Sequence, residues 1–453
     1  MSAAQQLPEA TAEVRQLSPA LEWGQGAILA TTLGLLMFGP LAFGAVEPWS
    51  LFVLQAGSAL LIGAWLVRSL LRNKLELRWN PALLPMTAML ALMTGQLMLP
   101  HWSAYRYATY ASLLIYLSYA TIVFLLTQTL TRTRHVRRAA MALGSYGVAI
   151  ASFAIIQNLS SPGKLYWVRA PRFGGWIYGP YVNHNHYAGL MEMLTPIPLV
   201  FAFTRYARGR KKWAAASAAA LMGASIFLSG SRGGMAAFAL QVALFFWFVF
   251  RERAHGRVAS VMATFPIASL AFVGWIGGSE VSKRITTLSP YKHSELAADM
   301  RRAINRDAIH MFTAHPILGF GAGAFGEVYP QFRAIYTNSL IDHAHNDYLE
   351  LLVETGVIGF GLGCWLIWAS FRSALRKVHN WPSDVNGAVS LSALLGIIGI
   401  LVHSFVDFNL QIPANAALFY ALCGIAAMDA RFKNPMRGHR RRDLAEDTMN
   451  LEI

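Results

Sequence analysis

Apolar stretches long enough to cross a lipid bilayer recur along this chain from Gly26 to Met428, and this pattern limits its possible folds more than any other feature. A transmembrane helix needs about 20 mostly apolar residues. The chain is 55% hydrophobic and only 13% charged, with a mean hydropathy of +0.40. Such a composition argues against a soluble globular protein. The sequence therefore predicts an all-α polytopic membrane protein.

Apolar runs between charged residues and Pro or Gly punctuation predict about twelve transmembrane helices. A cytoplasmic tail of residues 1–25 precedes this transmembrane region (26–428), and a basic cytoplasmic tail (429–453) follows it. The tail 1–25 lacks the basic start and cleavage site of a secretory signal, so we expect the first span to be retained as an anchor. The predicted spans are Gly26–Val46, Trp49–Val67, Pro81–Leu99, Tyr110–Leu130, Ala139–Ile156, Tyr187–Thr204, Trp213–Leu228, Gly233–Phe250, Val258–Ile276, Tyr348–Phe371, Gly387–Phe405 and Ala414–Met428.

The basic residues predict the orientation of these spans. A formal net charge of +15 would suggest nucleic-acid binding in a soluble protein. Most of the 38 Lys and Arg residues, however, lie in short loops on one side of the predicted spans and in the C-terminal tail. The positive-inside rule places those loops and both termini in the cytoplasm. We therefore expect these cations to face the lipid bilayer and the cytoplasm, and we expect no nucleic-acid partner.

The two long connections, Gln157–His186 and Gly277–Asp347, fall on the opposite, periplasmic side. Long loops often carry function. The second one, residues 277–347, lies between the ninth and tenth predicted spans and contains a helical pattern from Glu295 to Phe312. Its apolar stripe is formed by Leu296, Met300, Ile304, Ala308 and Met311.

Arg301 and Arg302 lie on the other face of this predicted helix. A guanidinium group binds phosphate oxygens in a bidentate manner. Periodicity alone is equally consistent with a phosphate-binding face and with an ordinary solvated basic face.

The segment from Asp342 to Glu350 runs from this loop directly into the tenth predicted span. Histidine has a pKa near working pH, so His343 or His345 can accept a proton from an attacking hydroxyl. Asp347 or Glu350 can orient that ring, and Asn346 offers an amide to a substrate. Such a concentration of ionisable groups at a membrane boundary favours a functional over a purely structural interpretation.

Two further polar clusters lie at the outer ends of predicted spans. Ser229-Gly230-Ser231-Arg232-Gly233-Gly234 is a tight turn whose glycines allow an anionic headgroup to approach the backbone, although a simple helix-hairpin turn is the alternative. The second cluster holds hydrogen-bonding groups suited to sugar hydroxyls, although each residue of this type is individually more often a satisfied interfacial side chain. Its members are His184, Asn185 and His186, which His403, Asp407, Asn409 and Gln411 face.

Neither a metal site nor a disulfide framework is predicted. The His-x-His spacings at His184/His186 and His343/His345 lack a third ligand that the sequence identifies. Cys364 and Cys423 both lie within predicted spans. We therefore expect no metal and no other cofactor.

Together these motifs resemble the O-antigen ligase and O-antigen polymerase superfamily. The resemblance rests on the Ser-Arg-Gly-Gly turn, the arginine helix leading into His315-Pro316-Ile317-Leu318-Gly319-Phe320-Gly321, the segment His345-Asn346-Asp347-Tyr348-Leu349-Glu350, and the block from Asp407 to Asn415. It covers mainly Tyr181 to Asn415, and the first five spans resemble the family only in being apolar.

The resemblance implies a GT-C-type membrane glycosyltransferase of the bacterial inner membrane. Such an enzyme takes a glycan from undecaprenyl diphosphate on the periplasmic face and transfers it, with inversion, to an acceptor hydroxyl. By similarity, Arg232 and Arg301 match the phosphate-facing arginines and His345 the catalytic histidine. Many relatives have an aromatic residue four positions after the second arginine. Asn305 stands there in this chain, so Arg301 and Arg302 are both candidates for the phosphate ligand.

The acceptor is not determined by these residues. A ligase would use lipid A-core as acceptor, whereas a polymerase would extend a growing polysaccharide with the same residues. A protein O-oligosaccharyltransferase is a third reading, and a non-enzymatic polysaccharide transporter is an alternative from a different class.

Overall fold

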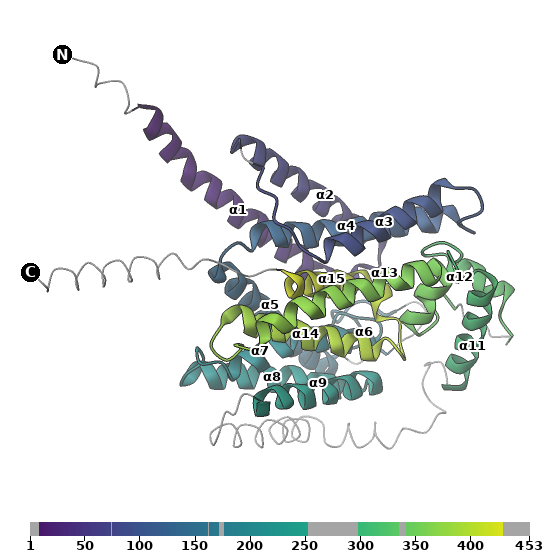
Figure 1. The fold of residues 1–453 in the computed structure, drawn as a ribbon. Helices are drawn as coiled ribbons and strands as arrows, with labels where there is room; N and C mark the ends of the chain where they lie inside the picture. The colour runs from purple at the N-terminus through teal and green to yellow at the C-terminus, as the bar shows by residue number, and fades with distance from the viewer. Residues whose placement is uncertain are drawn as a thin grey trace, which may run out of the picture.

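A computed structural model describes residues 9–73, 75–161, 163–171, 176–251, 298–334 and 341–428. Within these ranges the chain is helical, and its extended pairs are the two isolated bridges Leu165–Arg169 and Tyr178–Tyr181. The helices pack side by side, with α11 standing apart at one end of the bundle (Figure 1). The all-α prediction is therefore confirmed for the described part of the chain.

Most described helices overlap a predicted span, but α1 begins at Glu9, 17 residues before the predicted start of the first span at Gly26. The predicted ninth span, Val258–Ile276, lies outside the described residues. The elements are α1 (Glu9–Leu41), η1 (Phe43–Ala45), α2 (Pro48–Leu71), α3 (Leu83–Met98), α4 (Arg106–Thr129), α5 (Thr133–Ser160), α6 (His184–Leu194), α7 (Pro196–Ala202), α8 (Arg210–Ser229), α9 (Arg232–Arg251), α11 (Ala298–Ala314), α12 (Phe325–Val328), η2 (Tyr329–Gln331), α13 (Asp347–Val378), α14 (Val385–His403), η3 (Asn409–Gln411) and α15 (Pro413–Ala427).

Eight of the helices in the described ranges are long and apolar enough to cross a membrane, and α3 and α15 are shorter apolar helices. The chain is thus a multi-pass membrane protein. The predicted span Tyr187–Thr204 is not one continuous helix, because it divides into α6 and α7 at Thr195. Pro196, which begins α7, has no backbone N–H to continue the hydrogen-bond ladder of α6.

The centre of the bundle is formed by α14 and α6. Of the membrane-crossing window of α14, 83% is buried, and every residue of α6 is buried. α14 packs against α15, α9, α13, α6 and α7. Polar side chains on these two helices must therefore find partners inside the protein.

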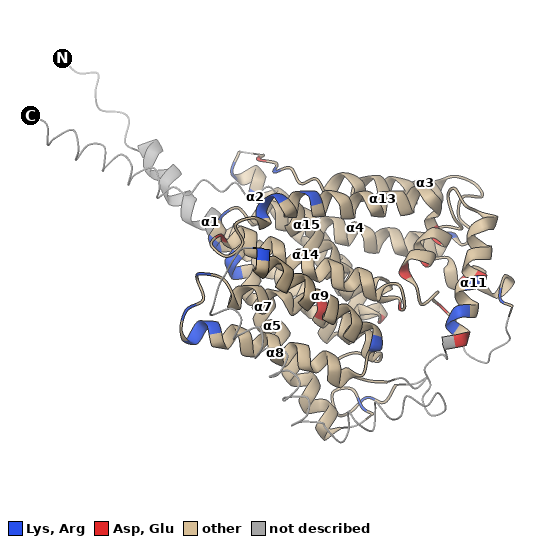
Figure 2. Ribbon diagram, turned by 60° about the horizontal axis from the view of Figure 1, so that its bottom comes forward, with Lys and Arg blue, Asp and Glu red and all other residues tan. Residues whose placement is uncertain are grey.

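The basic residues and the predicted site lie at opposite ends of the bundle. Most of the blue ribbon in Figure 2 lies toward the end where α8 begins, far from α11. The C-terminal ends of α2, α4, α9 and α13 and the N-terminal ends of α5 and α8 share that basic end. The N-terminal ends of α6, α13 and α15 share the other.

Helix α13 is broken at Gly356, which has φ 62° and ψ −167°. The segment 315–321, which precedes α12, satisfies the backbone groups released by this break. Phe320 N–H and Gly321 N–H each donate over 2.9 Å, to the carbonyls of Val353 and Glu354 respectively. Irregular backbone at membrane depth is tolerated only where protein supplies such partners.

The glycines of this segment allow the close contact. An ideal Cβ on Gly319 would lie 2.3 Å from the carbonyl carbon of Glu354, and one on Gly356 would lie 2.2 Å from the carbonyl oxygen of Ile317. The Gln96 side chain donates to the carbonyls of Leu318 (2.7 Å) and Glu354 (3.0 Å). The His-Pro-Ile-Leu-Gly-Phe-Gly motif therefore locks the outer loop onto α13.

Candidate active site

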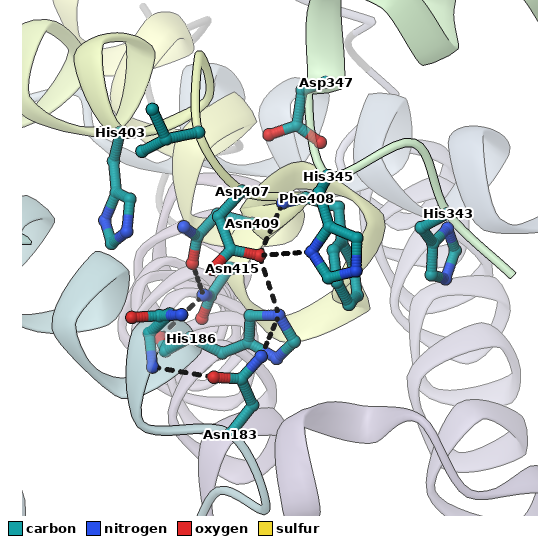
Figure 3. Close-up of polar contacts among 12 residues, drawn as sticks. Asn183, His186, His343, His345, Asp347, His403, Asp407, Phe408, Asn409 and Asn415 are labelled. Carbon is teal, nitrogen blue, oxygen red and sulfur yellow. Dashed lines mark hydrogen bonds and ion pairs between the residues drawn. The ribbon is translucent and has the colours of Figure 1, made fainter. Parts of the chain in front are cut away.

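The loop between α14 and η3, residues 404–409, is the centre of the candidate site. Predicted site residues from α6, the α8–α9 turn, α11 and the start of α13 all border this 404–409 loop. Figure 3 shows His186, His345 and Asp407 directed toward one another from three different elements. These elements are far apart in the sequence, so only the fold brings them together.

Asp407 lies between two histidines. Its Oδ1 is 3.7 Å from His345 Nδ1 and 3.9 Å from His186 Nε2, and it accepts a 2.9 Å hydrogen bond from the backbone N–H of Phe408. Both histidine distances exceed a direct hydrogen bond but lie within strong electrostatic range. The Asp407 side chain is 1% exposed, and its Oδ2 has no hydrogen-bond partner among the described residues.

The charge of Asp407 follows from these neighbours. Burial alone raises the pKa of its carboxyl, but the interactions with His345, His186 and His403 outweigh burial and lower the pKa below the usual Asp value. Asp407 is therefore a buried carboxylate bordered by imidazoles.

His345 has a backbone conformation that a histidine adopts rarely, with φ 52°. Its side chain is 14% exposed and is therefore not fully buried. The Phe408 ring packs edge-on against it at 4.7 Å between ring centroids. Backbone strain of this kind clusters at functional sites, where the surrounding structure enforces it.

His343 pairs with Glu350. Its Nδ1 lies 2.7 Å from Glu350 Oε1, and Glu350 Oε2 accepts a 2.8 Å hydrogen bond from the backbone N–H of Ala344. Burial lowers the pKa of His343, but the charge of Glu350 and this hydrogen bond outweigh burial and raise the pKa to about 9. His343 is therefore a cation at neutral pH, and its ring stacks on Phe408 at 4.5 Å.

The Asp347 carboxylate is hydrogen-bonded to the 404–409 loop and to Leu410, the residue that follows this loop. It accepts a 2.6 Å hydrogen bond from Ser404 Oγ and hydrogen bonds from Leu410 N–H at 3.1 and 3.2 Å. The prediction that Asp347 or Glu350 orients His345 is therefore wrong. Helical spacing within one segment suggested that pairing, but Glu350 folds back onto His343, and the nearby carboxylate is Asp407, 62 positions further along the chain.

Asn346 is the N-cap of α13. Its Oδ1 accepts hydrogen bonds of 3.1 Å from Tyr348 N–H and Leu349 N–H, and its Nδ2 donates to the carbonyl of Phe405 over 3.2 Å. An N-cap satisfies helix donors that have no intrahelical partner. In this structure the Asn346 side chain thus holds the start of α13 against the 404–409 loop.

The start of α6 supplies His184, Asn185 and His186, all of them buried. His184 stacks on Trp176 with ring centroids 4.5 Å apart, so it lies beside the α8–α9 turn, where Gly230 also meets Trp176. The Asn185 backbone N–H bonds the N-cap Asn183 at 2.9 Å. The three residues therefore face different surroundings, and His186 is the one that meets Asp407.

Asn409 and Asn415 tie the 404–409 loop to α6. Asn415 Nδ2 donates to the carbonyl of His186 at 2.9 Å and lies 3.3 Å from Asn409 Oδ1, while Tyr181 O–H donates to Asn415 Oδ1 at 2.8 Å. An ideal Cβ on Gly189 would lie 2.4 Å from Asn409 Oδ1. Asn415, Phe408 and Ser404 were not predicted as site residues. The Asp407–Asn415 block was the only signal for Asn415 and Phe408, and no sequence signal indicated Ser404.

The Ser-Arg-Gly-Gly turn packs against another histidine–carboxylate pair, formed by His403 and Glu192. His403 Nδ1 lies 2.8 Å from Glu192 Oε1, and its Nε2 lies 3.5 Å from Ser231 Oγ. An ideal Cβ on Gly233 would lie 2.6 Å from His403 Cδ2, and one on Gly234 would lie 2.7 Å from Ala188 Cβ. In the structure these two glycines therefore allow the start of α9 to pack on α14 and α6, a role that spacing had not indicated.

Arg232 opens α9 and is exposed, with no ion-pair partner among the described residues. The adjacent Gly233 lies against Val406: an ideal Cβ on Gly233 would be 2.9 Å from Val406 Cγ2. Arg232 is therefore anchored beside the 404–409 loop, while its guanidinium group is accessible.

The two arginines of α11 have different surroundings. Arg301 Nη1 donates to the carbonyl of Val406 over 3.1 Å, and its Nε is buried with no partner in the described part of the chain. The Arg302 side chain is 81% exposed and lies 3.6 Å from Asp299. Helix α11 itself buries Ile304, Ala308 and Met311, as its predicted apolar stripe requires. The geometry thus directs Arg301, and not Arg302, to the 404–409 loop.

No group of three His, Cys, Asp or Glu side chains within the described ranges has metal-binding geometry. Three histidines of the site instead pair with carboxylates: His343 with Glu350, His345 with Asp407 and His403 with Glu192. This arrangement can accept a proton at the imidazole of His345 and bind an anion at the guanidinium groups of Arg232 and Arg301.

Residues 217–364, about a third of the chain, match the family model described as O-antigen ligase. No curated protein matches the chain. The matched range includes Arg232, Arg301 and His345, and the resemblance predicted from the sequence motifs is thereby confirmed.

Proposed function

We propose that this multi-pass membrane protein, which carries an O-antigen ligase domain over residues 217–364, transfers a glycan from undecaprenyl diphosphate to an acceptor hydroxyl. The matched domain supports a membrane enzyme of the O-antigen ligase and polymerase superfamily that acts on lipid-linked glycans. The observation that carries the proposal is the arrangement of His345, Asp407, Arg301 and the Arg232 turn around the single 404–409 loop.

His345 is the general base of the proposed mechanism. Its Nδ1 faces Asp407 at 3.7 Å, which leaves Nε2 for the acceptor hydroxyl. As the hydroxyl oxygen attacks the anomeric carbon, its proton passes to His345 Nε2, and the negative charge of Asp407 stabilises the imidazolium that forms. The positive φ of His345 sets the ring in this position.

Arg232 and Arg301 bind the leaving group. The bond between the anomeric carbon and the phosphate oxygen breaks as the new glycosidic bond forms, so its electron pair and negative charge move to the lipid diphosphate. A guanidinium group stays charged at all relevant pH values and binds phosphate oxygens through paired N–H donors. Arg301 has a buried Nε without a protein partner, which is the kind of donor that a phosphate oxygen would satisfy.

This single displacement inverts the anomeric centre. His343, which Glu350 keeps positively charged, adds a fixed cation that stacks on the Phe408 ring. The site lies at the end of the bundle opposite the basic loops, so the positive-inside rule supports a periplasmic site in the inner membrane, with both termini cytoplasmic.

We further propose lipid A-core as the acceptor. The test uses an O-antigen-producing host from which the gene for this protein has been deleted. The host is complemented with the wild-type gene or with the His345→Gln variant, and its lipopolysaccharide is analysed on a gel. A ligase restores polymer on the core, whereas its loss leaves core without polymer.

Other outcomes of the same experiment contradict the acceptor. Core bearing a single repeat in the deletion host identifies a polymerase, and glycosylated periplasmic proteins identify a protein oligosaccharyltransferase. Purified protein that moves lipid-linked glycan across vesicles without forming a glycosidic bond would contradict transferase activity altogether.

A further inference from the structure

A second polar site lies at the basic end of the bundle, opposite the 404–409 loop. A cavity of about 220 Å³ opens there between α1 and the C-terminal ends of α2 and α4. Four arginines line it, Arg68, Arg72, Arg78 and Arg132, together with Gln25 and Gln128. Among the lining residues in the described part of the chain, Glu76 is the one carboxylate beside these four guanidinium groups.

The walls of this cavity are held by specific hydrogen bonds. Gln25 Nε2 donates to Thr131 Oγ1 at 2.9 Å and to the carbonyl of Thr129 at 3.0 Å, and Arg68 Nη2 donates to Gln25 Oε1 at 3.3 Å. Gln128 bonds both backbone groups of Arg78, at 2.9 and 3.0 Å. The chain segment after α2 is thereby fixed across the end of α4, so the arginines are gathered around a formed space.

Exposed apolar side chains lie next to the lining residues of this cavity in the sequence, at the end of α2 and in the segment after it. Leu70, Leu71, Leu75, Leu77 and Trp79 are 63% to 74% exposed. Exposed leucines and a tryptophan at the end of a transmembrane helix face acyl chains and the headgroup region of a bilayer. A phosphate in the cavity could therefore belong to a molecule whose chains lie along this apolar surface.

We propose that this cavity binds the phosphate group of an anionic lipid headgroup. Clustered arginines between transmembrane helices attract anionic lipids, and the guanidinium fork suits phosphate oxygens. The adjoining exposed leucines favour a lipid over a soluble phosphate. The site is separate from the proposed transferase site and does not depend on it.

The test uses the full-length protein, purified in detergent with equal amounts of phosphatidylglycerol and phosphatidylcholine, and native mass spectrometry to count retained lipids. Arg72→Gln/Arg78→Gln removes two exposed lining cations without removing a buried side-chain contact. Arg137→Gln/Arg138→Gln removes two exposed cations from the same end of the bundle but outside the cavity, and is the matched control. Gel filtration confirms that each variant is folded.

We expect the preference for phosphatidylglycerol to fall about tenfold in Arg72→Gln/Arg78→Gln and to change little in the control. An equal fall in both variants would overturn the proposal, because it would show only a general effect of net charge. Displacement of phosphatidylglycerol by excess inorganic phosphate would overturn the lipid assignment in favour of a soluble phosphate. Lipid retention unaffected by inorganic phosphate would support it.

Discussion

Three histidine–carboxylate pairs, His345–Asp407, His403–Glu192 and His343–Glu350, border the 404–409 loop, and the first two differ in distance and in access. His403 and Glu192 lie 2.8 Å apart with side chains 1% and 0% exposed. His345 and Asp407 lie 3.7 Å apart, and the His345 side chain is 14% exposed. The short, fully buried pair joins α14 to α6 beneath the α8–α9 turn. The longer, accessible pair has the freedom to exchange a proton with a substrate, and we therefore assign chemistry to it alone.

Replacing His345 tests that assignment with the largest expected effect. His345→Gln should lower the rate of glycan transfer about a thousandfold, because the acceptor hydroxyl loses its base. His345→Asn should have a similar effect while tolerating the left-handed backbone, since asparagine adopts positive φ more readily than most residues. Transfer is measured with purified protein, lipid-linked glycan and acceptor at equal protein amounts.

His403→Gln is the matching change in the buried pair. It should lower the yield of folded protein, yet the transfer rate of the protein that folds should stay within a few-fold of wild type. A thousandfold loss of rate in folded His403→Gln protein, with His345→Gln unaffected, would reverse the roles assigned to the two pairs.

The two arginines of α11 give the next largest difference. Arg301→Ala should slow transfer about a hundredfold, because a cation that meets the departing diphosphate is lost. Arg302→Ala should be close to wild type, since that side chain is 81% exposed and pairs only with Asp299 in the described structure. Equal losses in the two variants, measured in the same transfer assay, would exclude a specific role for Arg301.

Gly233→Ala tests whether the buried pair sets the position of the α8–α9 turn. The added Cβ would lie 2.6 Å from His403 Cδ2, so we expect the free energy of unfolding to fall by about 1–3 kcal/mol. Gly63→Ala in α2 is the control, because no atom lies within 4 Å of an ideal Cβ there. The midpoints of thermal unfolding of the two variants and the wild type are measured in the same detergent. An unchanged midpoint for Gly233→Ala would show that the turn is not tightly packed.

The smallest expected effect is the pH dependence of stability that His343 contributes. Glu350 raises the pKa of His343 to about 9, above its unfolded value, so this pair stabilises the fold fully below about pH 6.5 and progressively less as the pH rises through 9. His343→Gln should remove that decline. Thermal midpoints measured across this range would contradict the pair's contribution if wild type and variant had parallel curves.

Helix positions were predictable because a segment that crosses the lipid bilayer must itself be apolar along its length. α2, α8, α9 and α14 begin and end within a few residues of their predicted bounds. The division of Tyr187–Thr204 at Thr195 was missed, since a hydropathy pattern continues through a proline that the backbone cannot accommodate in one ladder. The count of twelve spans stays a prediction, with Val258–Ile276 outside the described residues.

Residue types at the site were also predictable, whereas their pairings were not. Chemistry and position indicated Arg301 with Arg302 and His343 with His345, and the family resemblance singled out Arg301 and His345, which both border the 404–409 loop. Local spacing paired His345 with Asp347 or Glu350, but Ser404 and His343 occupy those carboxylates. Asp407 was a candidate only as a sugar-binding group.

The sequence by itself determined a membrane-embedded helical bundle, its basic end and the polar residues at its other end, because hydropathy and charge act on each segment separately. Only the tertiary structure decided that Asp407 faces His345 and that Arg301 rather than Arg302 reaches the same loop. It also decided that Gly233 packs against His403, where a side chain would clash. These outcomes depend on distances between helices that are far apart along the chain, and no local pattern encodes such distances.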